Sequence, residues 1–296
     1  MSLAGMAWTA SHVGPDGLMP KGYWGEITSS LLWCEDKYRW SKYIAEVRLV
    51  QAGGAVLESL NKADSFVAPT LLDQPLNSFT NIGFIGLALF GARNCVLQNL
   101  PLRFTLTNLG IAFVGCGSFA FHATLLYEAQ LLDELPMIYT SLVLSYCILE
   151  DSKRGEPAKG GMWLPVGLVA VAALITAGYL ALPNPVLHQV AYAVIQIITT
   201  LRVLYLLYSK GSPLNASPES RAKCKMIKSS YQFGTIVFLT GFLIWNVDNI
   251  FCDSLRLVRA RVGTPFSAVF QGHAWWHILV SCSHASTNPR NPPSDI

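Results

Sequence analysis

The chain has 296 residues, of which 52% are hydrophobic and 13% are charged. Soluble globular domains carry about 25% charged residues, so this composition excludes a disordered chain and offers too little charge to cover a water-soluble protein. A formal net charge of +3 is too small to indicate nucleic-acid binding. The sequence therefore predicts an integral membrane protein.

The N-terminus and the cysteines argue against a cleaved signal peptide and against a cysteine-based scaffold. The first 22 residues have neither the basic segment nor the long apolar stretch of a cleaved signal peptide, so we expect membrane insertion to depend on the spans themselves. The seven cysteines are scattered singly, without a Cys-x-x-Cys pair. This spacing argues against a thiolate zinc site and a small disulfide scaffold, and leaves room for one bridge.

Seven mostly uncharged stretches approach the ~20 residues that a helix needs to cross a bilayer. They are Asn77–Ala92, Phe104–Leu126, Leu135–Leu149, Gly161–Leu182, Val186–Tyr208, Ser229–Val247 with an extension to Cys252, and Pro265–Cys282. We therefore expect an all-α bundle of seven transmembrane helices.

The basic residues lie mainly in alternate connections between these stretches. The first, third and fifth connections contain ten lysines and arginines, the second and fourth contain none, and the sixth contains three. By the positive-inside rule, the odd connections face the cytosol, with the N-terminus lumenal and the C-terminus cytosolic. The end of the second span, the start of the third, the end of the sixth and the start of the seventh then meet on the lumenal side.

Polar residues at those four ends are the candidates for function, because ionisable groups at membrane depth are costly and usually face the bundle interior. Ser118 and His122 stand four residues apart on one face of the second span, and Asp133 stands at the start of the third. His273 and His277 open the seventh span. Their spacing is the one by which a helix presents two imidazoles to a metal ion.

Three histidines on one side of the membrane favour a catalytic zinc site, because a structural site would be closed by four protein ligands. Each residue also has a simpler explanation. The histidine pair is also compatible with hydrogen bonding or an interfacial position, Ser118 with helix packing, and Asp133 with a helix cap. Asp248, at the end of the sixth span, is either a partner that orients a histidine or a polar helix terminus.

Seven short motifs follow one another along the chain. They are Gly22-Tyr-Trp-Gly, Trp33-Cys-Glu35, Tyr43-Ile-Ala-Glu46, Ser118-Phe-Ala-Phe-His122, Tyr127-Glu-Ala-Gln-Leu-Leu-Asp133-Glu-Leu-Pro136, Trp245-Asn-Val-Asp-Asn-Ile-Phe-Cys252 and His273-Ala-Trp-Trp-His277. Together these motifs resemble those of the alkaline ceramidases. The resemblance implies a seven-helix membrane amidase of the endoplasmic reticulum or Golgi that cleaves the N-acyl bond of ceramides to a sphingoid base and a fatty acid.

The resemblance also implies a role for each matching residue. His122, His273 and His277 correspond to zinc ligands, Ser118 to the group that assists the oxyanion, and Asp133 to the partner of the attacking water. Zinc suits this chemistry because it polarises an amide carbonyl and lowers the pKa of water from 15.7 towards ~7. Ceramide-type lipid and membrane lipids are the expected partners, and the sequence indicates no oligomeric state.

Two further features of the N-terminal segment follow from the resemblance. Cys34 and Cys252 correspond to a lumenal pair that the family joins as a disulfide. A calcium site of the family corresponds to Trp33, Glu35 and Glu46, but one acidic ligand is replaced by leucine and one asparagine by lysine. We expect these replacements to weaken a site of oxygen ligands for calcium.

The chain departs from the family pattern in two segments. Residues Val47–Leu76 form an atypical insertion before the first span, and the apolar seventh span stops at Cys282. We therefore divide the chain into an N-terminal lumenal segment (1–46), the insertion (47–76), a catalytic transmembrane bundle (77–282) with a shortened seventh helix, and a polar tail (283–296). The insertion and the tail are either real features or gene-model errors.

Two other functions remain open at this point. One is a seven-helix receptor of the progestin and adiponectin type, which shares a three-histidine zinc core. The other is a non-catalytic, damaged relative that keeps the core by descent. The Trp-Cys-Glu and His-Ala-Trp-Trp-His motifs favour the ceramidases.

Overall fold

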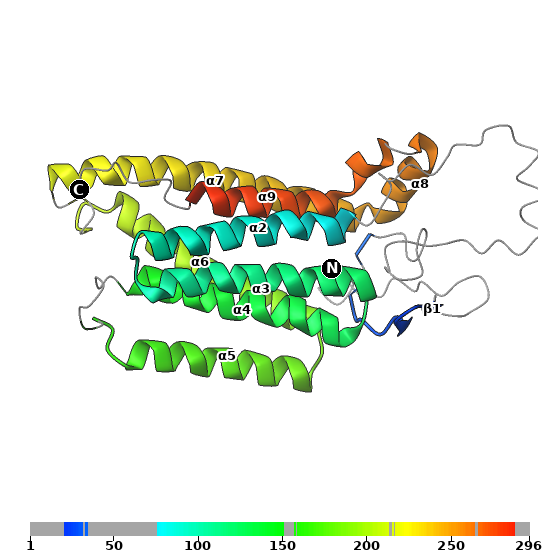
Figure 1. The fold of residues 1–296 in the computed structure, drawn as a ribbon, viewed down its shortest axis with the longest axis horizontal. Coiled ribbons are helices and arrows are strands. Elements are labelled where there is room, and N and C mark those ends of the chain that lie inside the picture. The colour runs from blue at the N-terminus through cyan, green and yellow to red at the C-terminus, as the bar shows by residue number, and fades with distance from the viewer. Residues whose placement is uncertain are drawn as a thin grey trace, which may run out of the picture.

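In the computed structural model of the chain, the residues described are 21–31, 33–34, 76–150, 157, 159–212, 215, 217–263 and 266–287. Their long helices run side by side, and a short hairpin lies near the N-terminus (Figure 1). The elements are β1 (Lys21–Gly22) and β2 (Gly25–Glu26), which pair antiparallel, α2 (Leu76–Leu97), α3 (Leu102–Thr124), α4 (Tyr127–Leu149), α5 (Trp163–Ala181), α6 (Pro185–Tyr208), α7 (Pro218–Ile250), α8 (Cys252–Val262), the 3-10 helix η3 (Phe266–Phe270) and α9 (Gly272–Thr287).

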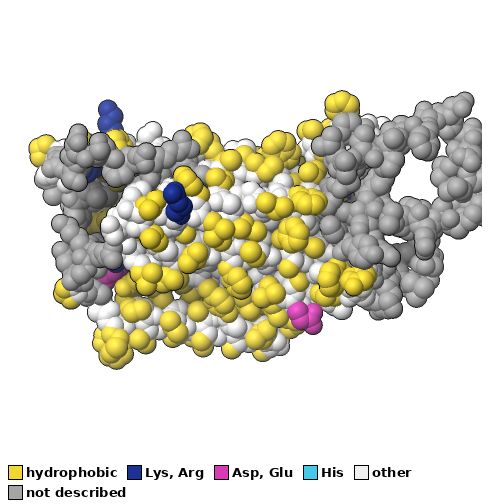
Figure 2. All heavy atoms as spheres, in the orientation of Figure 1, with side chains coloured by type: hydrophobic (Ala, Val, Ile, Leu, Met, Phe, Trp, Pro, Cys, Tyr) yellow, Lys and Arg dark blue, Asp and Glu magenta, His cyan; other side chains and the backbone are white. Residues whose placement is uncertain are grey.

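Six of these helices, α2 to α7, are long and apolar enough to span a membrane. One face of the bundle is covered mostly by hydrophobic side chains, with few charged groups (Figure 2). Such a surface suits hydrocarbon rather than water. The prediction of a multi-pass helical membrane protein is therefore confirmed, while α9, with 16 residues, is shorter than the other helices of the bundle.

The boundaries of the seventh predicted span are wrong. In place of one helix over Pro265–Cys282, the chain forms η3 and then starts α9 at Gly272. Asp248 explains this start, because its Oδ1 accepts the backbone N–H of Gly272 at 3.1 Å and satisfies a group that a helix N-terminus leaves unpaired. At its other end α9 continues past Cys282 to Thr287, so part of the predicted polar tail is helical.

The third predicted span also starts too late. Leu125 ends α3 in the left-handed conformation, with φ 53°, and Leu126 is extended, so the chain reverses within two residues and α4 begins at Tyr127. Asp133 therefore lies inside α4 rather than at its start, and Pro136 lies in the helix interior. The helix of the sixth span begins before the predicted residue Ser229, at Pro218. Ser217 caps this helix, α7, by accepting the Ser220 N–H at 3.0 Å.

The order of packing brings distant parts of the chain together. Helix α2 packs between α3 and α9, α9 packs against α7, and α4 packs against α3, α5 and α6. The end of α3 and the starts of α2, α4 and α9 lie at one end of the bundle, close to α8 and β1 (Figure 1). The predicted insertion lies outside the described residues, apart from Leu76 at the start of α2.

Candidate metal centre

The last turn of α3 supplies the first candidate ligand. His122 is fully buried there, and the next turn closes with the Leu125 N–H donating to the Phe121 carbonyl at 2.7 Å. An apolar cluster that includes Phe121, Leu125 and Trp33 packs at this end of the helix. His122 is therefore fixed between a helix terminus and a hydrophobic core.

The first two turns of α9 supply the other two candidate ligands. Gly272 lies so close to α7 that an added Cβ would be 2.7 Å from the Asp248 Cβ and 3.0 Å from the Ile244 carbonyl oxygen. This close approach, together with the Asp248 cap, sets where α9 begins. His273 and His277, one turn apart, then face α3 and are 5% and 8% exposed. Asp248 thus caps the start of α9 from a position near the end of α7, a role that the sequence did not predict.

The three histidines converge. Their ligand nitrogens all lie within 4.8 Å of one another, and the Nε2 atoms of His122 and His273 are 3.2 Å apart. Two ligands of a tetrahedral zinc ion at 2.0–2.1 Å are about 3.3 Å apart, so this spacing fits a shared ion. Imidazole nitrogens buried together also suit a borderline metal such as zinc.

Helix α2 fixes the orientation of His277. Its Nδ1 lies 3.1 Å from the Asn77 carbonyl oxygen and 3.0 Å from Thr80 Oγ1, while the Thr80 hydroxyl donates to the Leu76 carbonyl at 2.7 Å. A ring nitrogen held by a carbonyl in this way leaves Nε2 for a metal. The sequence analysis assigned no role to Asn77 or Thr80, although polar residues on one face of an apolar helix are the signal that could have found them.

Ser118 lies one turn before His122 on α3. It is 4% exposed, and its Oγ accepts a hydrogen bond from Asn81 Nδ2 at 3.2 Å. Asn81 Nδ2 also donates to the Asn77 carbonyl at 2.8 Å, so the hydroxyl is held from α2. Asn81 is a third residue of α2 whose role was not predicted from the sequence.

Asp133 reaches this region through a close contact between α3 and α4. A Cβ added to Gly117 would collide with the Leu132 carbonyl and lie 3.0 Å from the Asp133 backbone nitrogen. Pro136 lacks the N–H that would pair with the Leu132 carbonyl in a regular helix, so this carbonyl is free to turn to Gly117. Gly117 and Pro136 together bring Asp133, which is half-buried, alongside the turn that carries Ser118.

The N-terminal segment covers the site. The Trp33 ring stacks on His273 with centroids 4.9 Å apart. Cys34 is joined to Cys252 in a disulfide with Cα atoms 5.3 Å apart, and Arg259 Nη2 donates to the Cys34 carbonyl at 3.0 Å. The other two candidate calcium ligands, Glu35 and Glu46, lie outside the described residues.

Comparisons with known proteins identify a matching family and several relatives of the chain. The sequence profile of the Ceramidase family matches residues 66–288. The chain is 34% identical to alkaline ceramidase 3 of Mus musculus over 88% of the chain and 81% of that protein. It is 29% identical to alkaline ceramidase YPC1 of Saccharomyces cerevisiae, over 90% and 76%, and 30% identical to putative alkaline ceramidase dcd3A of Dictyostelium discoideum, over 90% and 87%.

Proposed function

This chain belongs to the ceramidase family, and we propose on that premise that it hydrolyses the N-acyl amide bond of ceramides to a sphingoid base and a free fatty acid. The convergence of three buried histidines at one end of a membrane bundle carries this proposal. An amide bond is a poor electrophile, so its hydrolysis needs a group that polarises the carbonyl and a base for water. The family match favours this function over the receptor alternative.

The metal proposed for the site is zinc, held by His122, His273 and His277. A catalytic zinc site has three protein ligands and one position left for substrate or water, which matches this donor set. Once bound, the ion would polarise the amide carbonyl and lower the pKa of water. Burial of the three rings keeps bulk water out, and the Asn77 carbonyl holds the His277 ring in one orientation.

Two side chains are assigned to proton transfer and charge stabilisation. The Asp133 carboxylate takes the proton of the attacking water and delivers a proton to the leaving amine. The Ser118 hydroxyl donates a hydrogen bond to the oxyanion that forms at the carbonyl. Asn81 supports this role, because its Nδ2 donates to Ser118 Oγ and leaves the hydroxyl proton available to the substrate.

The proposed location is the endoplasmic reticulum or Golgi membrane, with a lumenal N-terminus and a cytosolic C-terminus. The distribution of basic residues between the spans supports this orientation. The disulfide between Cys34 and Cys252 also supports it, because disulfides persist in oxidising compartments. The calcium site remains a proposal in weakened form, with Trp33, Glu35 and Glu46 as ligands.

Hydrolysis of a ceramide with a fluorescent acyl chain by the full-length protein in nanodiscs tests the proposal. We expect release of the fluorescent acid, inhibition by a zinc chelator, and loss of both zinc and hydrolysis in His122→Ala and His277→Ala. His284→Gln is the matched control, because His284 lies on α9 outside the cluster and bonds Asn108 Oδ1 at 3.0 Å. Chelator-resistant hydrolysis, or full activity in His122→Ala, would overturn the zinc mechanism. No hydrolysis by the folded, zinc-loaded chain would overturn the enzyme assignment in favour of a non-catalytic relative.

A further inference from the structure

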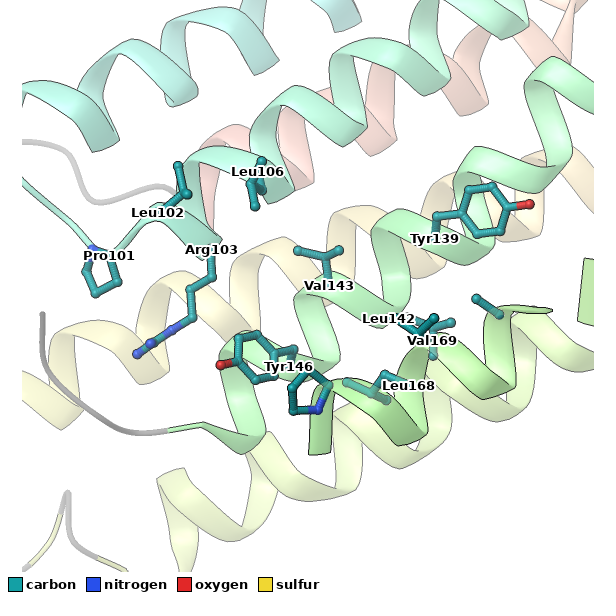
Figure 3. Close-up of a pocket in the computed structure, with 12 residues that line it drawn as sticks. Pro101, Leu102, Arg103, Leu106, Tyr139, Leu142, Val143, Tyr146, Leu168 and Val169 are labelled. Atoms are coloured by element: carbon teal, nitrogen blue, oxygen red, sulfur yellow. The ribbon is translucent and has the colours of Figure 1, made fainter. Parts of the chain in front are cut away.

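A lateral groove of about 600 Å³ lies between the start of α3, the second half of α4 and the first half of α5. Helix α4 lines it with Tyr139, Leu142, Val143 and Tyr146, and α5 lines it with Pro165, Leu168, Val169 and Ala172. Both sets have the spacing i, i+3, i+4, i+7, so each helix presents one continuous stripe to the groove. Figure 3 shows these side chains on facing helices.

The shape of the groove is fixed by polar contacts, because α5 is attached to the rest of the bundle beyond each end of the groove. At one end, the Glu150 carboxylate accepts the N–H groups of Lys159 and Gly160 at 3.0 and 2.9 Å and fixes the connection that leads into α5. At the other end, the Tyr179 hydroxyl donates to the buried Glu134 carboxylate. Tyr179 is also the buried residue of α5. Between these attachments α5 packs loosely and leaves the groove open on its outer side.

The polar part of the groove lies at one end. Figure 3 shows the Arg103 side chain and the Tyr146 ring at that end, while Tyr139 lies at the other. Arg103 is in the first turn of α3, which is where a spanning helix meets the headgroup layer. The groove follows α4 from Tyr139 to Tyr146, a rise of about 10 Å, which is about two thirds of one ~15 Å leaflet.

The groove is separate from the metal centre. Arg103 and His122 are at opposite ends of α3, about 28 Å apart at 1.5 Å per residue. Other basic residues lie at the Arg103 end, including the exposed Arg93 near the end of α2 and Lys159 before α5. Ceramide carries no charge, so the basic residues at this end of the bundle suit a lipid with a negatively charged headgroup better than they suit ceramide.

We propose that the groove binds an anionic glycerophospholipid, with one acyl chain along α4 and α5 and its phosphate against Arg103. The apolar lining matches the chain, and the groove's open side faces the hydrocarbon from which the lipid would enter. A planar guanidinium donates paired hydrogen bonds to phosphate oxygens, and basic pockets between membrane helices are typical headgroup sites.

Photo-crosslinking tests this site without relying on catalysis. The full-length protein is placed in nanodiscs that contain phosphatidylserine with a diazirine on its acyl chain, and peptide mass spectrometry locates the label. Phosphatidylcholine and a free fatty acid with the same diazirine chain serve as the other probes. We expect phosphatidylserine to label the groove stripes of α4 and α5 about fivefold more than phosphatidylcholine does, since one arginine near the headgroups favours an anionic lipid by about that factor.

Two pairs of variants separate the groove from general surface charge. Arg103→Gln should reduce groove labelling by phosphatidylserine to the phosphatidylcholine level, whereas Arg93→Gln removes the same charge at the same end outside the groove and should not. Val169→Trp should block the groove and reduce labelling, whereas Leu174→Trp, at an exposed site elsewhere on α5, should not.

Competition in the unmodified chain gives a readout that does not depend on the variants folding. Excess unlabelled phosphatidylserine should remove the groove label, and excess phosphatidylcholine should leave it. Equal labelling by both lipids, or equal loss in Arg103→Gln and Arg93→Gln, would overturn the proposal. Preferential labelling by the fatty acid would also overturn it and would assign the groove to a carboxylate lipid.

Discussion

Three polar residues of α2 hold the side chains of the proposed active site in position. The Asn77 carbonyl and the Thr80 hydroxyl lie at His277 Nδ1, and Asn81 donates to Ser118. None of the three has a formal charge or reacts, and all belong to a helix that carries no ligand. Their contribution is orientation, which in a buried site decides whether a ligand nitrogen or a hydroxyl points at the reacting atoms.

The role of Asp133 predicts a separation between metal binding and turnover. Asp133→Asn should keep zinc bound, because Asp133 is not a ligand, and should lower kcat by about 10²- to 10⁴-fold, because the amide side chain cannot accept the proton of water. Zinc content by mass spectrometry and steady-state hydrolysis are the measurements. Glu128→Gln is the matched control, since Glu128 is an exposed acid in the first turn of α4. Unchanged turnover in Asp133→Asn would remove this residue from the mechanism.

The hydrogen bond between Asn81 and Ser118 predicts non-additive variants. If Asn81 acts by orienting the hydroxyl, Asn81→Ala should lower kcat about tenfold, Ser118→Ala about 10²-fold, and the double variant should be no worse than Ser118→Ala alone. Zinc content should be unchanged in all three. Asn246→Ala is the control, because Asn246 is a half-buried residue of α7 that donates to the Phe242 carbonyl of its own helix. Fully additive losses would mean that Asn81 has a role of its own.

At the scale of elements, the contact between α3 and α4 is the one that the site depends on most. Gly117 allows the backbone of α4 to touch α3, and Pro136 frees the carbonyl that makes the contact. This pair of residues explains why a proline is accepted inside a helix, a position where it usually costs ~3 kcal/mol or more. The contact includes the backbone nitrogen of Asp133, so it sets how close this part of α4 lies to α3.

A single methyl group at Gly117 tests this contact. Gly117→Ala should push α3 and α4 apart and reduce hydrolysis and thermal stability together, because backbone atoms of Leu132 and Asp133 occupy the space of the new Cβ. Gly83→Ala, on α2, meets no atom within 4 Å and should stabilise the helix by up to about 1 kcal/mol. Thermal unfolding in detergent and ceramide hydrolysis measure both effects. A Gly117→Ala protein with normal stability and activity would show that α4 can shift without moving Asp133.

A buried polar network joins the N-terminal segment, α4 and α5. Gln130 accepts the Ser30 N–H at 2.8 Å, and its Nε2 donates to Glu134 at 2.8 Å and to Tyr179 at 3.0 Å. His188 of α6 adds its Nε2 at 2.8 Å from the Glu134 carbonyl. A satisfied network of this kind fixes one arrangement of helices, because leaving any member unpaired inside a membrane is costly.

The sequence predicted those parts of the molecule that depend on local patterns. Uncharged length identified the spans, and the spacing of His273 and His277 identified two members of the buried histidine cluster. The features that the sequence did not predict depend on contacts between distant segments. The start of α9 depends on a carboxylate from α7. Helix α4 accommodates Pro136 because the Leu132 carbonyl, which has no N–H of residue 136 to accept from, packs against Gly117 of α3. The orienting residues of α2 look like ordinary polar residues until His277 and Ser118 are placed beside them.

At the scale of the whole molecule, the two ends of the bundle differ in what they hold. One end holds the histidines, the disulfide and the segment around Trp33, and the other holds the lipid groove and, in the described part of the chain, most of the basic residues. The N-terminal segment reaches the histidine end by its own contacts, since the Thr28 and Ser29 N–H groups donate to the Leu125 carbonyl at 3.3 and 3.1 Å. Its attachment therefore does not depend on the residues that follow it in the chain.

This independence predicts that the insertion is dispensable. Deletion of residues 47–75 keeps Leu76, whose carbonyl accepts the Thr80 hydroxyl, and leaves residues 35–46 to connect Cys34 to α2. Twelve residues span up to about 40 Å, which is ample for two attachment points at the same end of the bundle. We expect the shortened chain to bind zinc and hydrolyse fluorescent ceramide as the full chain does.

Both chains should be assayed in the same microsomes at alkaline pH, with and without a zinc chelator. Chelator-sensitive hydrolysis by both would show that neither the insertion nor the short α9 prevents catalysis. Activity in the shortened chain alone would contradict the expectation and identify the insertion as an obstruction. Activity in the full chain alone would mean that the inserted residues contribute to the site, and the family profile, which starts at residue 66, would then direct the search to residues 66–75.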